Sequence, residues 1–259
     1  MYLAFLGTGT SQGVPVIACH CNVCQSDDQR DKRLRSSVLV SGNDGTNILI
    51  DIGPDFRQQM LLNSVQHLEA ILITHAHRDH VGGIDDIRPL NWVQKRKMDV
   101  YANNEAIRSL THDYHYIFEY HQYPGLPEVT LHDVSQAEPF QVGSMTVTPV
   151  KGMHKDLPVL GFRIDESQRH LAYITDMNHI DDNELKKLDG LDVLVINALR
   201  HEKHFSHFCL PEALDIIDRC QPQKAFLTHM SHEMGLHAVV DQTLPENVRL
   251  AYDNLKISI

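Results

Sequence analysis

The sequence predicts an α+β fold in which two β-sheets are covered by outer helices. Short apolar segments of strand type alternate with turn signals along the chain, and a few amphipathic helices lie between them. The strands are expected to run first antiparallel and then mixed, with helices between them, and this order fits two covered sheets best. No solenoid repeat, low-complexity segment or linker marks a second domain, so residues 1–259 are predicted to form one domain of two similar halves.

The elements follow from local patterns. The N-terminal segment Met1-Tyr2-Leu3-Ala4-Phe5-Leu6 has no basic leader and no long apolar run, so it is interpreted as the first strand. Strands are predicted near residues 2–7, 36–41, 47–52, 70–74, 99–102, 129–133, 145–150, 159–164, 170–175, 192–197, 224–228 and 249–258. Helices are predicted near residues 55–64, 82–97, 104–120, 183–188 and 211–220. The last helix has Pro211 in its first turn and an apolar face made of Leu210, Ala213, Ile216 and Ile217.

Composition restricts the class of protein. The chain has 259 residues, of which 42% are hydrophobic, so it can bury a large core. Its formal net charge of -11 disfavours a broad surface for extended nucleic acid, because phosphate backbones are held mainly by Lys and Arg. Bound divalent ions would reduce that charge locally, so a small anionic substrate is compatible with it. No segment approaches the roughly 18 apolar residues of a membrane span, and we expect a cytoplasmic protein that does not bind membranes.

One segment carries most of the chemical information. The apolar run Ile71-Leu72-Ile73-Thr74 ends in His75, His77, Asp79 and His80, which are three imidazoles and one carboxylate within six residues. Such side chains are suitable ligands for zinc, manganese or iron(II). They cannot all face one ion, so the cluster indicates two metals side by side. Paired metals of this kind usually hold a bridging hydroxide and attack an ester or amide linkage.

Other strands end in the same way. Thr175-Asp176 and Thr228-His229 follow apolar strands as Thr74-His75 does, and a short loop after the strand 145–150 leads to His154. Ligands in α/β architectures gather outside the carboxyl ends of strands, because the connecting loops converge there. These remote side chains are therefore expected to join the first cluster.

The order H-x-H-x-D-H resembles the metallo-β-lactamase superfamily. That resemblance implies a four-layer αββα sandwich with the metal site in the cleft between the two sheets. It also implies that His75, His77 and His154 hold one ion, that Asp79, His80 and His229 hold the other, and that Asp176 bridges them. A bridging carboxylate can hold two divalent ions about 3.5–4 Å apart, the spacing used in phosphoryl displacement. The zinc β-lactamases typically have a cysteine at the position of Asp176, so this residue argues against that branch.

Asp51 ends another strand and resembles the buried aspartate that supports the ligands in this superfamily. Its expected role is to orient the loop from His75 to His80 through hydrogen bonds.

The cysteines indicate a further metal site. Cys19, Cys21 and Cys24 supply three of the four ligands of a tetrahedral zinc site, whereas Cys209 and Cys220 resemble ordinary buried thiols. The opening Gly7–Pro15, the C-x-C-x-x-C cluster and the segment Leu227–His232 together resemble the PhnP-type phosphodiesterases. The match runs from Gly7 to Asp253, and in that family the second histidine of T-H-x-S-H completes the zinc site, which implies His232 as the fourth ligand.

The resemblance also implies a general acid. His207 corresponds to the histidine that protonates the leaving alkoxide in PhnP-type enzymes, and His204 and His201 compete for that assignment. Asp79 is expected to take part in catalysis as well as in metal binding. The aromatic-rich segment 114–123 fits either a lid that stacks on a sugar or base or an amphipathic helix that buries its aromatic face.

Three functions are compatible with these observations. The first is a binuclear phosphodiesterase that uses two zinc or manganese ions and one structural zinc on a small, cyclic or nucleotide-like phosphodiester. The second is a tRNA 3′-end processing endonuclease, whose extended arm and basic surface are not visible in the sequence. The third is a non-catalytic carrier of a cofactor pathway, which would not need a bridging metal pair. A homodimer is compatible with the general frequency of such assemblies.

Overall fold

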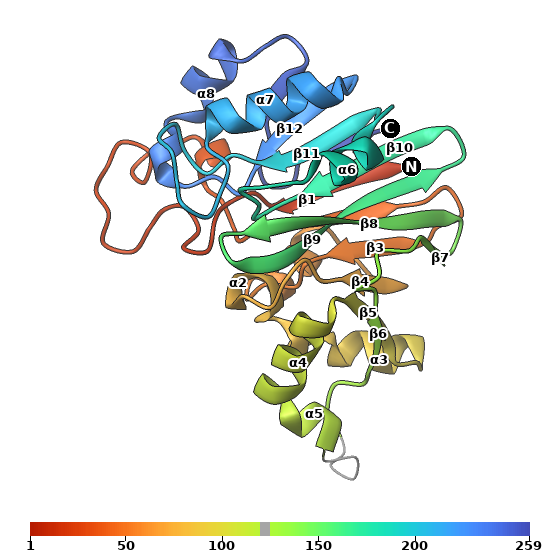
Figure 1. Ribbon diagram of the computed structural model, residues 1–259. Coiled ribbons are helices and arrows are strands. Elements are labelled where there is room, and N and C mark those ends of the chain that lie inside the picture. The colour runs from red at the N-terminus through yellow and green to blue at the C-terminus, as the bar shows by residue number, and fades with distance from the viewer. Residues whose placement is uncertain (120–124) are drawn as a thin grey trace.

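The computed structural model describes residues 1–119 and 125–259 of the chain. Within these residues the strands form two seven-stranded sheets, with strand orders β14-β1-β2-β3-β4-β5-β6 and β13-β12-β11-β10-β9-β8-β7. Figure 1 shows the two sheets lying against each other, with helices α3 to α5 beyond one and α6 to α8 beyond the other. This confirms the predicted four-layer αββα sandwich.

The first sheet combines both kinds of strand pairing. Its strands are β1 (Tyr2–Gly7), β2 (Ser37–Ser41), β3 (Asn47–Ile50), β4 (Ala70–Leu72), β5 (Met98–Ala102), β6 (Val129–Asp133) and β14 (Lys256–Ser258). Strands β14, β1, β2 and β3 pair antiparallel, and β3 to β6 pair parallel. Parallel pairing points the carboxyl ends of β3 and β4 to the same edge, where Asp51 and His75 follow.

The second sheet has the same division. Its strands are β7 (Phe140–Val142), β8 (Met145–His154), β9 (Leu157–Glu166), β10 (Arg169–Ile174), β11 (Val193–Asn197), β12 (Lys224–Thr228) and β13 (Val248–Leu250). Strands β7 to β10 pair antiparallel, and β10 to β13 pair parallel. The parallel half brings the ends of β10 and β12, and therefore Asp176 and His229, to one edge.

Short helices connect the strands. The α-helices are α1 (Phe56–Leu62), α2 (Arg78–Val81), α3 (Arg88–Gln94), α4 (Asn104–Asp113), α5 (His115–Glu119), α6 (Asp182–Leu185), α7 (Leu210–Cys220) and α8 (His237–Val240). Single 3₁₀ turns lie at Gln29–Asp31, Ile84–Ile87, Lys186–Leu188, His232–Met234 and Asp241–Thr243. In the part of the chain that the structure describes, no helix is long and apolar enough to cross a membrane.

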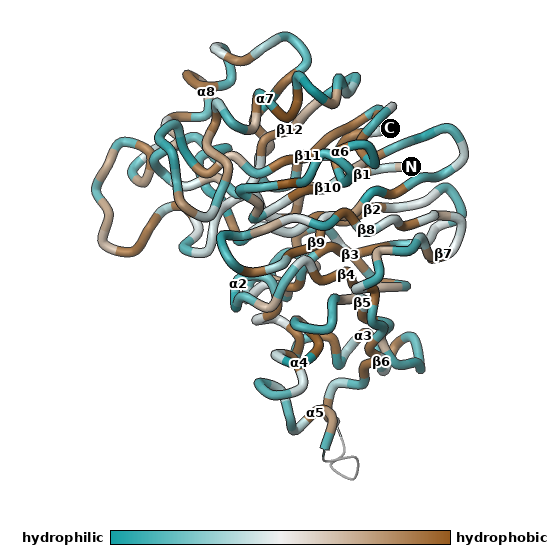
Figure 2. The backbone as a smooth tube through the Cα atoms, in the orientation of Figure 1, coloured by the Kyte–Doolittle hydropathy of each residue, from teal (hydrophilic) through white to brown (hydrophobic). Residues whose placement is uncertain are grey.

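Three apolar layers hold the sandwich together. The central layer packs Phe5 of the first sheet against residues such as Phe226 of the second, with ring centroids 5.5 Å apart. One outer layer lies between the first sheet and α1 to α5, and the other lies between the second sheet and α6 to α8. In Figure 2 the hydrophobic colour follows the strands, while the connecting loops are largely hydrophilic. Burial on both faces explains why β4 is apolar throughout and why β11 is apolar up to its last residue, Asn197.

Some predicted boundaries were wrong. The predicted strand 249–258 is two short strands, β13 and β14, that belong to different sheets. The predicted helix 82–97 consists of a 3₁₀ turn, Ile84–Ile87, followed by α3. Gly83 precedes both, and a side chain there would meet the backbone oxygen of Gly53 at 2.3 Å. The predicted helix 104–120 breaks at Tyr114, and residue 120 lies outside the described residues.

Candidate metal centre

The predicted ligands meet where the strands of the two sheets end. Three residues that lie one or two positions beyond strand ends are left-handed without being glycine: Asp51 at φ 64°, Asp176 at φ 54° and His229 at φ 56°. This conformation is costly for such residues, and it concentrates at functional sites where the surrounding structure enforces it. Each strand therefore ends in a sharp turn at a residue whose side chain belongs to the cluster.

Asp176 lies at the centre of the cluster. Its Oδ1 is 2.9 Å from Nδ1 of His229, and its Oδ2 is 3.1 Å from Nε2 of His80 and 3.5 Å from Nε2 of His75. Potential ligand atoms form three overlapping groups: Asp79 with His80, Asp176 and His229; His75 with His77 and Asp176; and His154 with Asp176 and His207. Asp176 is common to all three groups, so its carboxylate lies where the three groups meet.

Several buried nitrogens in the cluster make no hydrogen bond of good geometry. Among the described residues, Nε2 of His75, Nε2 of His80, Nδ1 of His154 and Nδ1 of His207 make no aligned hydrogen bond. Buried polar atoms are nearly always satisfied, so orphaned imidazole nitrogens beside carboxylates fit a site for a cation. The donor set of imidazoles and carboxylates is also the one that divalent transition metals prefer.

Hydrogen bonds fix the tautomers of the cluster histidines. Thr74 Oγ1 lies 2.9 Å from Asp51 Oδ2, to which it donates, so it accepts from Nδ1 of His75 at 3.1 Å. Asp51 Oδ2 likewise accepts from Nδ1 of His80 at 2.6 Å. A ring that carries its proton on Nδ1 presents the lone pair of Nε2, and in both histidines Nε2 faces Asp176. The expected role of Asp51 in orienting the loop from His75 to His80 is confirmed.

Two supporting side chains were not singled out from the sequence. Thr74 was noted only as part of the strand-end pattern, although its backbone nitrogen also donates to Asp51 at 2.9 Å. Ser36 donates to the carbonyl of Gly9 at 2.9 Å, and its hydroxyl oxygen lies 3.1 Å from Nδ1 of His229. Ser36 precedes β2 in an ordinary polar context, and no local signal in the sequence could have identified it.

Electrostatics support the same interpretation. Burial and the neighbouring His80 hold the pKa of His75 well below its ordinary value. Burial also acts to lower the pKa of His80, but three surrounding carboxylates outweigh it and raise that pKa well above its ordinary value: Asp79, Asp51 and Asp176. A buried centre with this much negative charge needs positive charge for compensation, which bound cations would supply.

Two further predicted ligands, His77 and His154, lie at the edge of the cluster. The His77 ring centroid is 4.5 Å from that of His75 and 5.1 Å from that of His154. His154 is the last residue of β8, so the predicted loop between that strand and His154 was wrong. Gly152 lies inside this strand, where only a glycine fits, because a Cβ at that position would be 2.2 Å from the sulfur of Met177.

His207 is buried within the cluster. Its ring centroid lies 4.6 Å from that of His154 and 5.0 Å from that of His229. Of its competitors, His204 lies behind it at 5.2 Å, and Nε2 of His201 hydrogen-bonds the carbonyl of Met234 at 2.9 Å. Burial lowers the pKa of His207 to about 3, so its surroundings favour a neutral ring, whereas the predicted general acid must be cationic. A bound phosphate anion would act in the opposite direction and raise this pKa.

The second predicted cluster also forms. His232 Nδ1 lies 3.4 Å from the sulfur of Cys19 and 3.3 Å from that of Cys21, and Cys24 belongs to the same group. A tetrahedral ion with bonds of about 2.3 Å to sulfur and 2.0 Å to nitrogen would place these atoms roughly 3.5 Å apart. A backbone hydrogen bond from Cys24 and the contact with His232 lower the pKa of Cys21 to about 6. The four side chains therefore fit a metal site that fastens the N-terminal loop beside His229.

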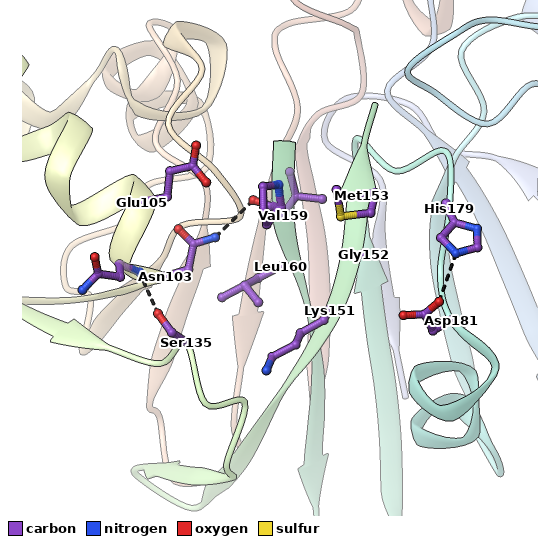
Figure 3. A pocket seen from close by; sticks show the side chains of 12 residues that line it. Asn103, Glu105, Ser135, Lys151, Gly152, Met153, Val159, Leu160, His179 and Asp181 are labelled. Carbon is purple, nitrogen blue, oxygen red and sulfur yellow. Dashed lines mark hydrogen bonds and ion pairs between the residues drawn. The ribbon is translucent and has the colours of Figure 1, made fainter. Parts of the chain in front are cut away.

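A separate cavity of 410 Å³ lies between β8 and the start of α4 (Figure 3). Several of its polar side chains already have partners: Asn103 donates to the carbonyl of Pro158 at 3.2 Å, Ser135 accepts from the nitrogen of Asn104 at 2.7 Å, and His179 contacts Asp181 at 3.1 Å. The cavity contains none of the predicted ligands, so the chemistry is assigned to the Asp176 cluster.

Comparisons with known proteins agree with this architecture. The beta-lactamase superfamily domain matches residues 46–230. A solved diphosphatase from the PhnP family shares 37% identity and a TM-score of 0.90, covering 99% of this chain and 96% of that one. The chain therefore belongs to the beta-lactamase superfamily and, within it, to the PhnP family. This confirms the resemblance inferred from the sequence and makes the protein a hydrolase of the metallo-β-lactamase fold.

A third match has a different name. A protein of Porphyromonas gingivalis named octanoyltransferase is 42% identical over 260 residues, which cover all of this chain but 52% of that protein. The chain thus spans about half the length of that relative. Zn²⁺-bound PqqB from Methylobacterium extorquens, at 18% identity and TM-score 0.81, and the short form of human tRNase Z, at 20% and 0.77, show the shared fold alone.

Proposed function

We propose that this chain is a metal-dependent phosphodiesterase that hydrolyses a small, cyclic or nucleotide-like phosphodiester. The observation that carries the proposal is the position of Asp176, whose carboxylate is shared by all three groups of potential ligand atoms. A shared carboxylate is suited to a pair of divalent ions, and paired ions stabilise both the attacking and the leaving oxygen of a phosphoryl group.

The proposed ligand sets follow the superfamily pattern. His75, His77 and His154 would hold one ion, Asp79, His80 and His229 would hold the other, and Asp176 would contact both. Zinc and manganese both suit imidazole and carboxylate ligands. When bound, the ions would supply positive charge for the phosphoryl oxygens and lower the pKa of a water molecule. Cys19, Cys21, Cys24 and His232 would hold a third, structural zinc ion.

Other side chains are proposed to orient the ligands and to donate a proton. Asp51 and Thr74 keep Nε2 of His75 and of His80 directed at the centre, so the ligands need little reorganisation. Asp79, whose side chain is 11% exposed, lies at the open edge of the cluster, where a substrate would approach. His207 is proposed to donate the proton to the leaving oxygen, because it is the buried histidine beside the cluster that was not assigned as a ligand.

The proposal is tested with bis(p-nitrophenyl) phosphate and a cyclic nucleotide, using protein loaded with zinc or with manganese. Metal-dependent release of nitrophenol supports a phosphodiesterase, and its absence in every metal-loaded form would refute it. A tRNA precursor assay tests the endonuclease, which the net charge of -11 disfavours. Tight binding of a small molecule without turnover would instead support a carrier.

A second candidate is hydrolysis of a diphosphate linkage. The observation in its favour is the 37% identity to a PhnP-family diphosphatase over almost the whole of both chains. A phosphorus of a substituted P–O–P linkage resembles that of a phosphodiester, because each carries a charged oxygen and two oxygens that join it to other groups. Comparing a nucleoside diphosphate sugar with bis(p-nitrophenyl) phosphate separates the two substrate classes.

Octanoyl transfer is not proposed for this site, because the relative that carries that name is about twice as long as this chain. We also expect the protein to act in the cytoplasm. The five cysteines are unpaired with one another, as a reducing compartment would require.

Replacing Cys21 with serine is expected to remove one zinc ion and to lower the melting temperature. Serine is a poor zinc ligand, and the loop that carries Cys19 and Cys24 would lose its attachment to His232. Metal analysis and thermal unfolding measure the two effects, with Cys220→Ala as the matched control, because Cys220 lies far from the cluster in α7. Free reaction of all three cluster thiols in the native protein would contradict the zinc site.

Replacing Asp51 with asparagine is expected to weaken binding of the catalytic metals by about 10- to 100-fold, the usual effect of losing a residue that orients ligands. The neutral amide cannot accept from Nδ1 of His80 and the hydroxyl of Thr74 as strongly as the carboxylate does. Competition with a chelator measures the affinity. Unchanged metal affinity would show that the His75–His80 loop keeps its conformation without the hydrogen bonds of Asp51.

A further inference from the structure

A groove borders the cluster beside Asp79. It has a volume of 540 Å³, and the side chains that bound it include Ser11, Arg35, Arg78, Asp85 and Tyr114. Asp79 itself lines the groove and also belongs to the group of potential ligand atoms around Asp176. A molecule bound in the groove would therefore lie directly against the proposed metal centre.

Arg78 is held in place at the edge of this groove. Its Nη1 donates to the hydroxyl of Tyr114 at 2.6 Å, and its guanidinium carbon lies 5.1 Å from the centre of the Tyr114 ring. Tyr114 is in turn buried, and its hydroxyl donates to the carbonyl of Val81 at 3.1 Å. A guanidinium has five donor hydrogens in a planar fork, so most of them are left for a ligand.

Arg78 also lacks a counter-charge of its own. Across residues 1–119 and 125–259 no carboxylate forms an ion pair with it. The other arginine of the groove, Arg35, is different, because its Nε lies 3.0 Å from a carboxylate oxygen of Asp55. Asp85 accepts the hydroxyl of Tyr116 at 2.5 Å, and Asp79 would be occupied as a ligand. The groove thus presents one ordered, uncompensated cation and one partly compensated cation.

The sequence left open whether the aromatic segment 114–123 forms a lid or buries its aromatic face. The contacts of Tyr114 and Tyr116 bear on this choice. Tyr114, between α4 and α5, is buried, and Tyr116 of α5 is half-buried against the same core, so these two aromatic side chains pack inward as the buried-face interpretation expects. Tyr120, His121 and Tyr123 lie outside the described residues. The hydroxyl of Tyr114 also positions the guanidinium of Arg78, from which it accepts a hydrogen bond.

We propose that this groove binds a phosphate group of the substrate other than the one that is attacked, and that Arg78 is the residue that selects for it. The inference rests on the proposed function for the identity of the attacked group. Guanidinium groups bind phosphate through paired hydrogen bonds and are favoured where such planar recognition is needed. The substrate class is therefore a phosphoric ester or anhydride with a second phosphate, such as a nucleoside diphosphate derivative.

The first test compares two substrates in the metal-loaded enzyme, ADP-ribose with two phosphates and bis(p-nitrophenyl) phosphate with one. Arg78→Gln should raise KM for ADP-ribose by about 10- to 100-fold, the range for losing a hydrogen bond to a charged group. It should change kcat for ADP-ribose, and both constants for the single-phosphate ester, by much less. Arg78→Lys should recover part of the loss, and Arg108→Gln, an exposed arginine of α4, is the matched control.

The second test does not depend on turnover. Inorganic diphosphate and orthophosphate are titrated calorimetrically into the protein as purified, with metal content measured afterwards. Arg78→Gln should weaken diphosphate binding about tenfold and leave orthophosphate binding nearly unchanged. Equal losses for both anions, or none for diphosphate, would overturn the inference. Arg78-dependent diphosphate binding by a protein that hydrolyses neither ester would support the groove and refute the proposed function.

Discussion

Replacing Asp176 with alanine is expected to abolish phosphodiester hydrolysis and to lower the content of catalytic metal. The carboxylate of Asp176 lies within 3.5 Å of imidazole nitrogens of His75, His80 and His229. Burial opposes its ionisation, yet His229 and His80 hold its pKa well below the ordinary value, so it is charged. Without this charge, the repulsion between two divalent ions in this buried space would be less compensated. Metal analysis and steady-state kinetics measure the two effects.

Two further variants make the result specific. Asp182→Ala removes an exposed carboxylate whose side chain is 83% accessible, and it should leave activity and metal content unchanged. Asp176→Asn keeps one oxygen ligand but not the charge, so it should retain more metal than the alanine variant while remaining nearly inactive. Near-normal turnover of Asp176→Ala with both ions retained would show that the bridging carboxylate has been misassigned.

The positions of the ligands along the chain could be predicted because strand ends are visible in the sequence. An apolar run that stops at a threonine and continues with a histidine or aspartate indicates both a buried strand and a polar end, as at His75, Asp176 and His229. The convergence of these ends follows from parallel pairing of β3 with β4 and of β10 with β11 and β12. Neither step requires knowledge of side-chain contacts.

The geometry inside the cluster could not be predicted in this way. The left-handed backbone at Asp51, Asp176 and His229 carries no local signal, because those residue types do not require it. Contacts between distant segments are equally hidden, as with the hydrogen bond between His229 and Ser36, which are 193 positions apart.

Errors in the predicted elements have a related cause. A short loop was predicted between the strand 145–150 and His154, yet β8 continues to His154, and Gly152 lies inside it against Met177. Tyr114 matches the helical pattern around it, yet the helix breaks at that residue, whose hydroxyl contacts Arg78 and Val81. Tertiary contacts decide both cases, and a single sequence does not display them.

Replacing His207 with alanine is expected to discriminate between leaving groups. A general acid assists most when the leaving oxygen is strongly basic, so kcat for an alkyl phosphodiester should fall by about 10²–10⁴-fold. Nitrophenolate is stable without a proton, and the loss with bis(p-nitrophenyl) phosphate should be much smaller. The exposed residue His112 provides the control variant His112→Ala, because its side chain is 89% accessible and lies on α4.

The position of His207 makes a second outcome informative. Its ring groups with His154 and Asp176 as a potential ligand, although the prediction counts it as an acid. Retained metal together with a leaving-group-dependent loss would identify a proton donor. Equal losses on both esters would point to a hydrogen bond with a phosphoryl oxygen that a neutral ring can make, consistent with the lowering of the His207 pKa to about 3 by burial. Loss of a metal ion would make His207 a ligand and transfer the acid role to His204, whose ring centroid lies 5.2 Å behind it.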